Sequence, residues 1–207
     1  MNIMKKLLIL LIVCTSGIYS CKNAVTRKYG ITEPKIETIR SITAELRGYS
    51  ADFPSYLCVF RDSAALVDWF RHKNMPGRSQ FYNSSGFRII TQDSLFCSKV
   101  EADFAGNLKP DKIYRIDSSV IFEHLRKNII PLGEKADTDP SKYSFTCVIF
   151  WAKFMGKVNE ASMDIARSAM RSRPAVNGKV NLLFVNMDML DTWNVSENMI
   201  RMDMKKR

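Results

Sequence analysis

The sequence predicts an α/β fold in which helices flank a sheet. Apolar segments of strand length alternate along the 207 residues with segments whose apolar side chains recur at helical spacing. Two strand-like segments, 145–151 and 180–185, are apolar without alternation, which is typical of strands covered on both faces. Because such strands are usually parallel and joined by a helix, part of the sheet should be parallel.

In the first half of the chain, turn and capping residues separate the expected elements. Gly48 closes an amphipathic helix, Asp62 and Ser63 can cap another, and a Gly-containing turn joins two strand-like runs as a hairpin. The expected elements are a helix over 36–47, a strand over 55–61, a helix over 63–71, a hairpin over 79–91 and a helix over 94–104.

The second half repeats the rhythm of strand followed by helix. Asp117 or Ser118 can cap a helix that contains Ile121, Phe122 and Leu125, and Asn159 can cap another. The expected elements are a strand over 112–116, the Asp117 helix, a loop over 131–143, a strand over 145–151, the Asn159 helix, a strand over 180–185 and a last helix over 192–205.

The N-terminus has the pattern of an export signal. Lys5 and Lys6 precede a short apolar run that ends in small residues before Cys21, and the run is too short to span a membrane. Residues 18–21, Ile-Tyr-Ser-Cys, resemble the bacterial lipobox, so we expect a lipid on Cys21. The expected division is a signal peptide over 1–20, a tether over 21–35 and a domain over 36–207. Ordinary signal peptidase cleavage near Ser20 is the alternative.

An anchored lipoprotein of this kind belongs to the cell envelope. The residues after the anchor, Lys22 and Asn23, lack the aspartate that retains some lipoproteins in the inner membrane, which favours the outer one. Removal of Lys5 and Lys6 leaves 29 of the 31 basic residues against 21 acidic ones, a net charge of +8. Because the domain is expected to be exported, we do not expect nucleic acid to be the partner of this positive charge.

Three cysteines remain in the domain, and an odd number leaves at least one outside any intrachain disulfide. Cys58 and Cys147 lie in apolar strand-like runs, where free cysteine usually behaves as a small buried apolar residue. A bridge from Cys58 to Cys97 is the alternative. The histidines, His72 and His124, are far in sequence from any cysteine pair, and we expect neither a metal site nor a cofactor.

Residues 148–159 read Val-Ile-Phe-Trp-Ala-Lys-Phe-Met-Gly-Lys-Val-Asn, the end of an apolar strand followed by the start of a helix. They resemble the active-site segment of the thioredoxin (redoxin) family. That family has a buried strand ending in Phe-Trp-Ala, one further residue, Trp-Cys-Gly-Pro-Cys-Lys, and a long helix. The resemblance covers 145–188 and implies a thioredoxin-like sheet. The matched residues are Phe150, Trp151, Ala152 and Gly156, with Phe154 in place of the second tryptophan.

The departures from the family pattern concern its chemistry. Met155 takes the place of the nucleophilic cysteine, Val158 that of the resolving cysteine and Ile149 that of the buried aspartate. Because thiol–disulfide exchange needs a thiolate, no catalytic residue of the family carries over to this chain.

The order of elements also departs from the family, which places a cis-proline, a hairpin and a helix after its third strand. Here Pro76, the 79–91 hairpin and the 94–104 helix come upstream. We therefore expect a permuted thioredoxin-like sheet with an N-terminal helical arm. Pro76 is the candidate for the cis-proline, and an ordinary turn proline is the alternative.

Three classes of function follow. The first is a non-catalytic, membrane-anchored domain that binds a protein or peptide at the edge that corresponds to the family's active site. We expect this edge to comprise Trp151, Phe154, Met155, Gly156, Val158 and Pro76, with Met187 and Met189 lining it as well. The second is a thiol–disulfide redox protein that uses Cys97 with Cys58 or Cys147. The third is an envelope lipoprotein with a purely structural role.

Overall fold

The computed structural model describes residues 27–71, 79–91, 98–176 and 179–193. Within these residues a seven-stranded mixed sheet forms the centre, with the order β5-β4-β3-β7-β8-β2-β6. β7 and β8 are parallel, as are β8 and β2, and the remaining neighbours are antiparallel. The strands are β2 (Leu57–Phe60), β3 (Ser79–Asn83), β4 (Phe87–Ile89), β5 (Ile116–Ile121), β6 (Ile129–Pro131), β7 (Phe145–Trp151) and β8 (Val180–Asn186).

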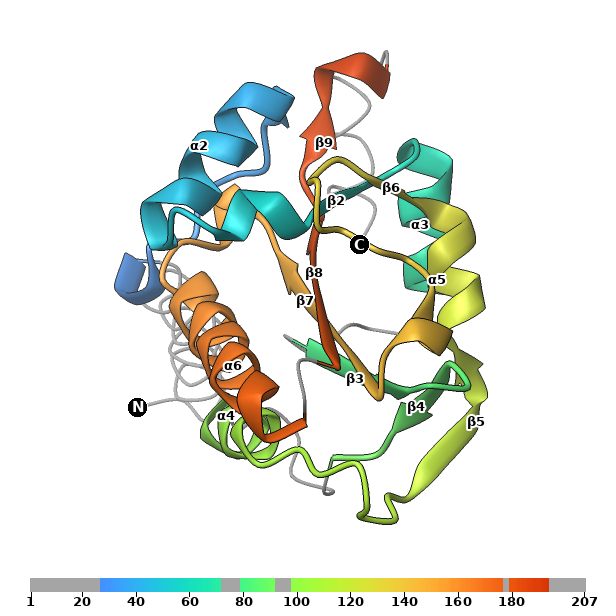
Figure 1. Cartoon of the computed structure of the whole chain (residues 1–207). Coiled ribbons are helices and arrows are strands. Elements are labelled where there is room, and N and C mark those ends of the chain that lie inside the picture. The colour runs from blue at the N-terminus through green and yellow to red at the C-terminus, as the bar shows by residue number, and fades with distance from the viewer. Residues whose placement is uncertain (1–26, 72–78, 92–97, 177–178, 194–207) are drawn as a thin grey trace, which may run out of the picture.

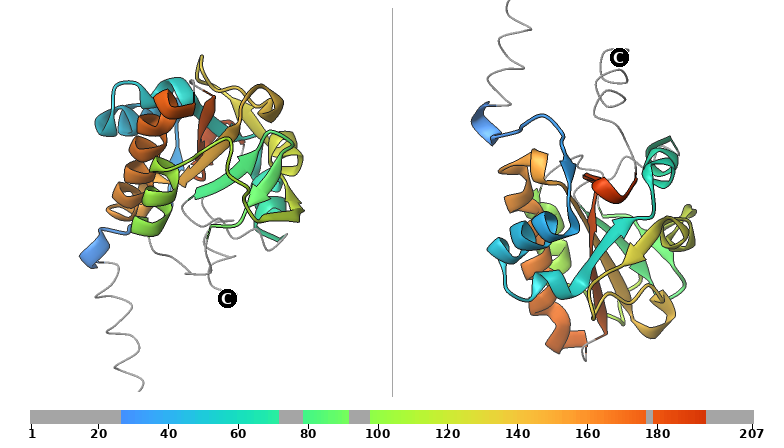
Figure 2. Two further views of the ribbon diagram at one scale, coloured as in Figure 1. Left: turned by 60° about the horizontal axis from the view of Figure 1, so that its bottom comes forward. Right: turned by 90° about the horizontal axis from the view of Figure 1, so that it is seen from above.

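Helices cover both faces of this sheet (Figures 1 and 2). One face carries α2 (Ile39–Tyr49), α4 (Ser98–Gly106) and α6 (Val158–Ser172), and the other carries α3 (Ser63–Arg71) and α5 (Phe122–Asn128). The α/β class expected from the sequence is thus confirmed. A separate parallel pair, β1 (Ile36–Glu37) with β9 (Met189–Leu190), lies beyond the end of β8.

The core has two halves, one on each side of the sheet. Every residue of β7 and β8 is buried, as their unbroken apolar patterns predicted. Because side chains alternate along a strand, Cys147, Ile149 and Trp151 pack under α6, whereas Val148 and Phe150 pack under α3 and α5.

The expected hairpin is present and pairs with the central strand. β3 and β4 are antiparallel neighbours, and β3 runs antiparallel to β7 with Ser79 opposite Ile149 and Asn83 opposite Phe145. The segment between the hairpin and β7 in sequence includes α4, which packs against α6. The strands β3, β4 and β5, which precede β7 in sequence, therefore form one side of the sheet next to β7.

Two sequence predictions in the second half were wrong. The strand expected over 112–116 lies instead at Ile116–Ile121, and the helix begins at Phe122 rather than at Asp117 or Ser118. Asp117 caps no helix, because its carboxylate bonds Arg88 of the neighbouring strand and accepts from the amide and hydroxyl of Ser119. Pairing with β4 outweighed the local capping signal.

The helical arm also begins later than expected. Ile36 and Glu37 form β1, and Thr38 caps α2 by accepting a hydrogen bond from the amide of Ser41 at 3.0 Å. The helix passes through Gly48 and ends at Tyr49. The Asp62 cap is confirmed, since its carboxylate accepts from the amide of Ala65 at 2.7 Å. The last expected helix lies almost wholly outside the described residues.

Candidate functional site

The segment that resembles the family motif forms a tight loop between β7 and α6. After Trp151 the chain takes a short 3-10 turn over Lys153–Met155. Gly156 then has φ +53° and ψ −131°, a conformation that is essentially restricted to glycine. This backbone turn lets α6 begin at Val158. We call residues 152–157 the motif loop.

Asn159 holds the motif loop closed from inside the protein. Its side-chain amide donates to the carbonyl of Ala152 at 2.8 Å, and its side-chain oxygen accepts from the amide of Ala152 at 3.4 Å. Asn159 is buried, and it was expected to cap the helix. That expectation was wrong, because the side chain bonds the end of β7 rather than the first turn of α6.

A second buried polar residue, Asp188, supports the same loop from β8. One of its oxygens accepts from the amide of Lys153 and from the side-chain amide of Asn186, each at 2.8 Å. Burial raises the pKa of Asp188 above its ordinary value, although these two hydrogen bonds act in the opposite direction. The loop thus rests on a carboxyl group whose ionisation the fold disfavours.

A segment of the N-terminal part of the chain lies directly on the motif loop. We call residues 27–37 the strap; Figure 2 shows it crossing close to the start of α6 before it enters α2. The amide of Thr32 donates to the carbonyl of Phe154 at 2.9 Å, and the amide of Lys157 donates to the carbonyl of Tyr29 at 2.7 Å. These contacts join main chain to main chain, so they do not depend on the strap's side chains.

Gly156 makes this close approach possible. A Cβ atom at Gly156 would overlap the carbonyl oxygens of Tyr29 and Gly30. The missing side chain therefore serves two purposes, the backbone conformation and the space for the strap.

The far end of the strap is held by charge and by strand pairing. Glu37 accepts from the ammonium of Lys153 at 2.8 Å and from the hydroxyl of Ser41 at 2.5 Å. Ile36 and Glu37 pair in parallel with Met189 and Leu190. Part of the expected tether thus contacts the domain, at Tyr29, Gly30 and Thr32.

The structure brings together most of the residues that the sequence singled out at this edge. Trp151 is buried, whereas Phe154, Met155, Gly156 and Val158 are half-buried around the motif loop. Met187 and Met189, expected at the same edge, are half-buried after β8. Pro76, Cys97 and Cys21 lie outside the described residues, so the cis-proline, the Cys97 thiol and the lipid anchor stay predictions.

Sequence reasoning missed the residues that organise this site. Glu37 and Lys153 are separated by 116 positions, and no local pattern connects them. Asn159 carried a signal, but its interpretation as a helix cap was the wrong one. Asp188 follows the strand at 180–185, and nothing in the sequence shows that its carboxylate turns back to the motif loop.

The described cysteines are core residues on opposite faces of the sheet. Cys58 and Cys147 are free, fully buried thiols in different halves of the core. Burial raises the pKa of Cys58 to about 12 and the pKa of Cys147 well above its ordinary value. Neither supplies the exposed, easily ionised thiol that exchange chemistry needs.

We expect Cys58 and Cys147 to resist thiol reagents in the folded protein and to react together on unfolding, because burial denies them both solvent and ionisation. Alkylation followed by intact mass measurement, with and without denaturant, checks this. Fast modification of either residue in the native chain would contradict the described core. The same measurement in oxidising buffer tests the redox alternative, which now requires a disulfide that contains Cys97.

Asp188→Asn should change the pH dependence of stability. The folded state holds the Asp188 proton to higher pH than the unfolded chain, so this residue's contribution to stability falls as pH rises through the interval between the two pKa values. Relative to the wild type, Asp188→Asn is expected to gain stability as pH increases from about 3 to about 7. Urea unfolding over that range measures the difference, and a constant difference would contradict this account.

Glu37→Gln should act with the opposite sign. Burial raises the pKa of Glu37, but hydrogen bonds from Lys153 and Ser41 and the charge of Lys153 outweigh it, so the pKa lies below its ordinary value. Ionised Glu37 therefore stabilises the folded state. This stabilisation is complete above the ordinary pKa of glutamate and is lost as pH falls through the lowered pKa. Glu37→Gln is therefore expected to destabilise the protein near neutral pH more than in acid, as urea unfolding at both values would reveal.

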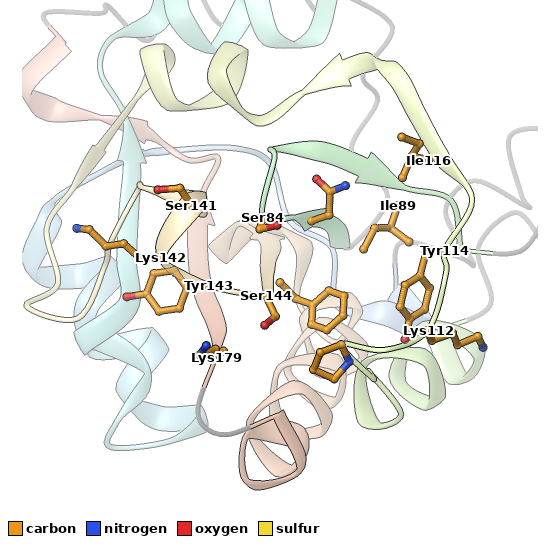
Figure 3. A pocket seen from close by; sticks show the side chains of 13 residues that line it. Ser84, Ile89, Lys112, Tyr114, Ile116, Ser141, Lys142, Tyr143, Ser144 and Lys179 are labelled. Carbon is orange, nitrogen blue, oxygen red and sulfur yellow. The ribbon is translucent and has the colours of Figure 1, made fainter.

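A separate hollow of about 370 Å³ lies at the opposite end of β7 (Figure 3). Its rim includes Lys112, Lys142 and Lys179, and rings of Tyr114 and Phe145 meet within it at 5.6 Å between centroids. The side chains of Lys112 and Lys142 extend to opposite sides in Figure 3, and Lys142 is paired with Asp137 at 3.0 Å. These ammonium groups do not converge on one ligand position.

Over the described residues, none of the helices has the length and apolar character needed to cross a membrane. Within the same ranges, His, Cys, Asp and Glu side chains do not gather in groups of three or more that could hold a metal ion. Comparisons of this chain with protein-family models, curated proteins and solved structures gave no match. The proposals below therefore rest on the residues and their geometry.

Proposed function

We propose that this chain is a lipid-anchored envelope protein whose thioredoxin-like domain carries out no redox chemistry and binds an extended peptide segment of a protein partner at the motif loop. The observation that carries the proposal is the main-chain pairing of the strap with Phe154 and Lys157. A surface that holds one extended segment through its backbone can hold another, since such contacts are independent of sequence.

The strand order supports the thioredoxin-like part of the proposal. β7, α6 and β8 form a parallel βαβ unit that leads through the motif loop, and the β3–β4 hairpin pairs antiparallel with the other side of β7. A thioredoxin-like sheet with its hairpin moved upstream would have this strand order, which supports the proposed permutation.

The chemistry of the loop supports binding rather than exchange. Met155 and Val158 lie half-buried where the family has its two cysteines, and the described thiols are in the core. What the loop offers is an apolar rim, a main-chain acceptor at Phe154 and a main-chain donor at Lys157. An adjoining open hollow of about 600 Å³, lined by α2 residues and Lys153, gives space for partner side chains.

A peptide with the sequence of residues 27–37, added in trans, tests the proposal. Thr32→Pro removes the amide that donates to Phe154, which weakens the resident strap by about one hydrogen bond. The variant should therefore bind the labelled peptide roughly fivefold more tightly than the wild-type chain does, as measured by fluorescence anisotropy. Thr32→Ala is the matched control, because it keeps the amide and changes an exposed side chain.

A second peptide, with proline at the position of Thr32, should not bind either chain. Equal affinity of the two peptides, or no binding to Thr32→Pro, would show that the motif loop is not a main-chain docking site. Where binding is found, a photo-crosslinking amino acid at Met155 in living cells identifies the natural partner.

A further inference from the structure

The strap determines which side of the domain can face the membrane. The main-chain bonds at Tyr29 and Thr32, the pairing of β1 with β9 and the Glu37–Lys153 ion pair attach residues 29–37 to one end of the sheet, where β7 and β8 terminate. We call this end the motif-loop edge. An anchor at the N-terminal part of the chain would therefore hold this end of the domain close to the membrane.

The length of chain before the strap is short. Cys21 and Arg27 are six residues apart, and a fully extended chain covers at most about 3.6 Å per residue, or roughly 20 Å in all. A folded domain of this size is about 40 Å across. β7, with its seven residues, extends for roughly 20 Å from the motif loop to the opposite end of the sheet. The chain between Cys21 and Arg27 is therefore too short to let the domain turn its opposite end towards the anchor.

The exposed charges at this edge suit an anionic surface. The exposed basic residues here are Arg27, Lys28, Lys35, Arg40 and Lys157, and the exposed carboxylates are Glu33, Glu45, Glu160 and Asp191. The basic side chains gather at Arg27, Lys28 and Lys157, whereas Glu45 lies on α2 and Asp191 follows β9. Lys153 and Glu37 neutralise each other. Tyr29 is 40% exposed with the ammonium of Lys28 5.7 Å from its ring centre, and tyrosine beside lysine is typical of headgroup depth.

We infer that the motif-loop edge faces the bilayer and contacts anionic lipid headgroups through Arg27, Lys28 and Lys157. The inference rests on the proposed lipidation of Cys21. It places the peptide site next to the membrane, so that its partner is the membrane-proximal segment of another envelope protein. The hollow of Figure 3, at the opposite end of β7, then faces away from the bilayer.

Energy transfer in vesicles tests this orientation. The lipidated chain carrying Cys97→Ser is reconstituted in vesicles of phosphatidylethanolamine and phosphatidylglycerol that contain a headgroup acceptor dye. A donor dye is attached at Lys157→Cys or, as the matched control, at Lys179→Cys, another exposed lysine at the opposite end of the sheet. Transfer from position 157 should be roughly twofold larger than from position 179. Equal transfer, or more from position 179, would overturn the inference.

The headgroup contact is tested without the anchor. The mature chain, residues 21–207 with Cys21→Ser, lacks the apolar signal segment. It should sediment with phosphatidylglycerol-containing vesicles and not with phosphatidylcholine vesicles, and high salt should release it. Reversal of Arg27 and Lys28 to glutamate should reduce binding severalfold, whereas reversal of Lys112 and Lys179 should leave it unchanged. The opposite ranking, or binding to both vesicle types, would refute the headgroup contact.

The membrane orientation and the peptide-binding function can be refuted independently of each other. Intact mass shows whether Cys21 carries lipid, and an unmodified Cys21 overturns the orientation. The peptide titration with Thr32→Pro uses no vesicles and decides the binding function independently.

Discussion

Replacing Gly156 with alanine is expected to expel the strap from the motif loop and to destabilise the protein. The backbone at Gly156 has φ +53° and ψ −131°, which costs a residue with a side chain about 1–3 kcal/mol. The new methyl group would also overlap the carbonyl oxygens of Tyr29 and Gly30. Urea unfolding measures the stability loss, and hydrogen exchange at the amides of Thr32 and Lys157 measures release of the strap.

Gly86→Ala separates the effect of backbone strain from the effect of steric overlap with the strap. Gly86 also has a positive φ, +77°, but a Cβ there would meet only Phe122 and Pro140 at ordinary contact distances of 3.6 and 3.7 Å. It should therefore cost stability through backbone strain while the amides of Thr32 and Lys157 keep their protection. Unchanged exchange at those amides in Gly156→Ala would show that the strap does not depend on this glycine.

Trp151→Ala is expected to cause a still larger loss of stability. Trp151 is 1% exposed and belongs to the half of the core under α6. Truncation of a large buried aromatic side chain typically costs about 3–5 kcal/mol, because it removes buried apolar surface and leaves a cavity. Thermal and urea unfolding measure the change, followed by circular dichroism so that the signal does not depend on the deleted indole.

Trp151→Phe distinguishes packing from a specific indole interaction. Within the described residues the buried indole nitrogen of Trp151 has no hydrogen-bond partner, so phenylalanine should retain most of the stability. A loss as large as that of Trp151→Ala would mean that the indole N–H makes a contact outside the described residues. Peptide binding by Trp151→Phe should match the wild type, since Trp151 supports the motif loop from below rather than lining its surface.

The sequence contained enough information to predict the sheet and its two central strands. The unbroken apolar runs at 145–151 and 180–185 correspond to β7 and β8, and the turn at Asn83–Gly86 correctly predicted the β3–β4 hairpin. These elements follow from local patterns, because hydrophobic burial on both faces and turn chemistry are properties of short segments.

Edge elements were predicted less well. β5 carries exposed Ile116 and Ile121, with the polar residues 117–119 and buried Val120 between them, so its pattern does not separate a strand from the start of a helix. Pairing with β4 decides the outcome, and it joins residues far apart in sequence, such as Ile89 with Ile116 and Arg88 with Asp117. The short β6 was missed for the same reason, since its three residues become a strand only beside β2.

By itself, the sequence determined the α/β class, the presence of Met155 and Val158, which have no thiol, at the loop before α6, and the apolar setting of Cys58 and Cys147. Only the tertiary structure decided that the strap lies on the motif loop, that Glu37 meets Lys153 and that Asn159 and Asp188 hold the loop from within. The physical reason is that these contacts join segments far apart in the chain through single hydrogen bonds and one ion pair. Such contacts produce no periodic pattern in the sequence and arise only after the core has brought the segments together.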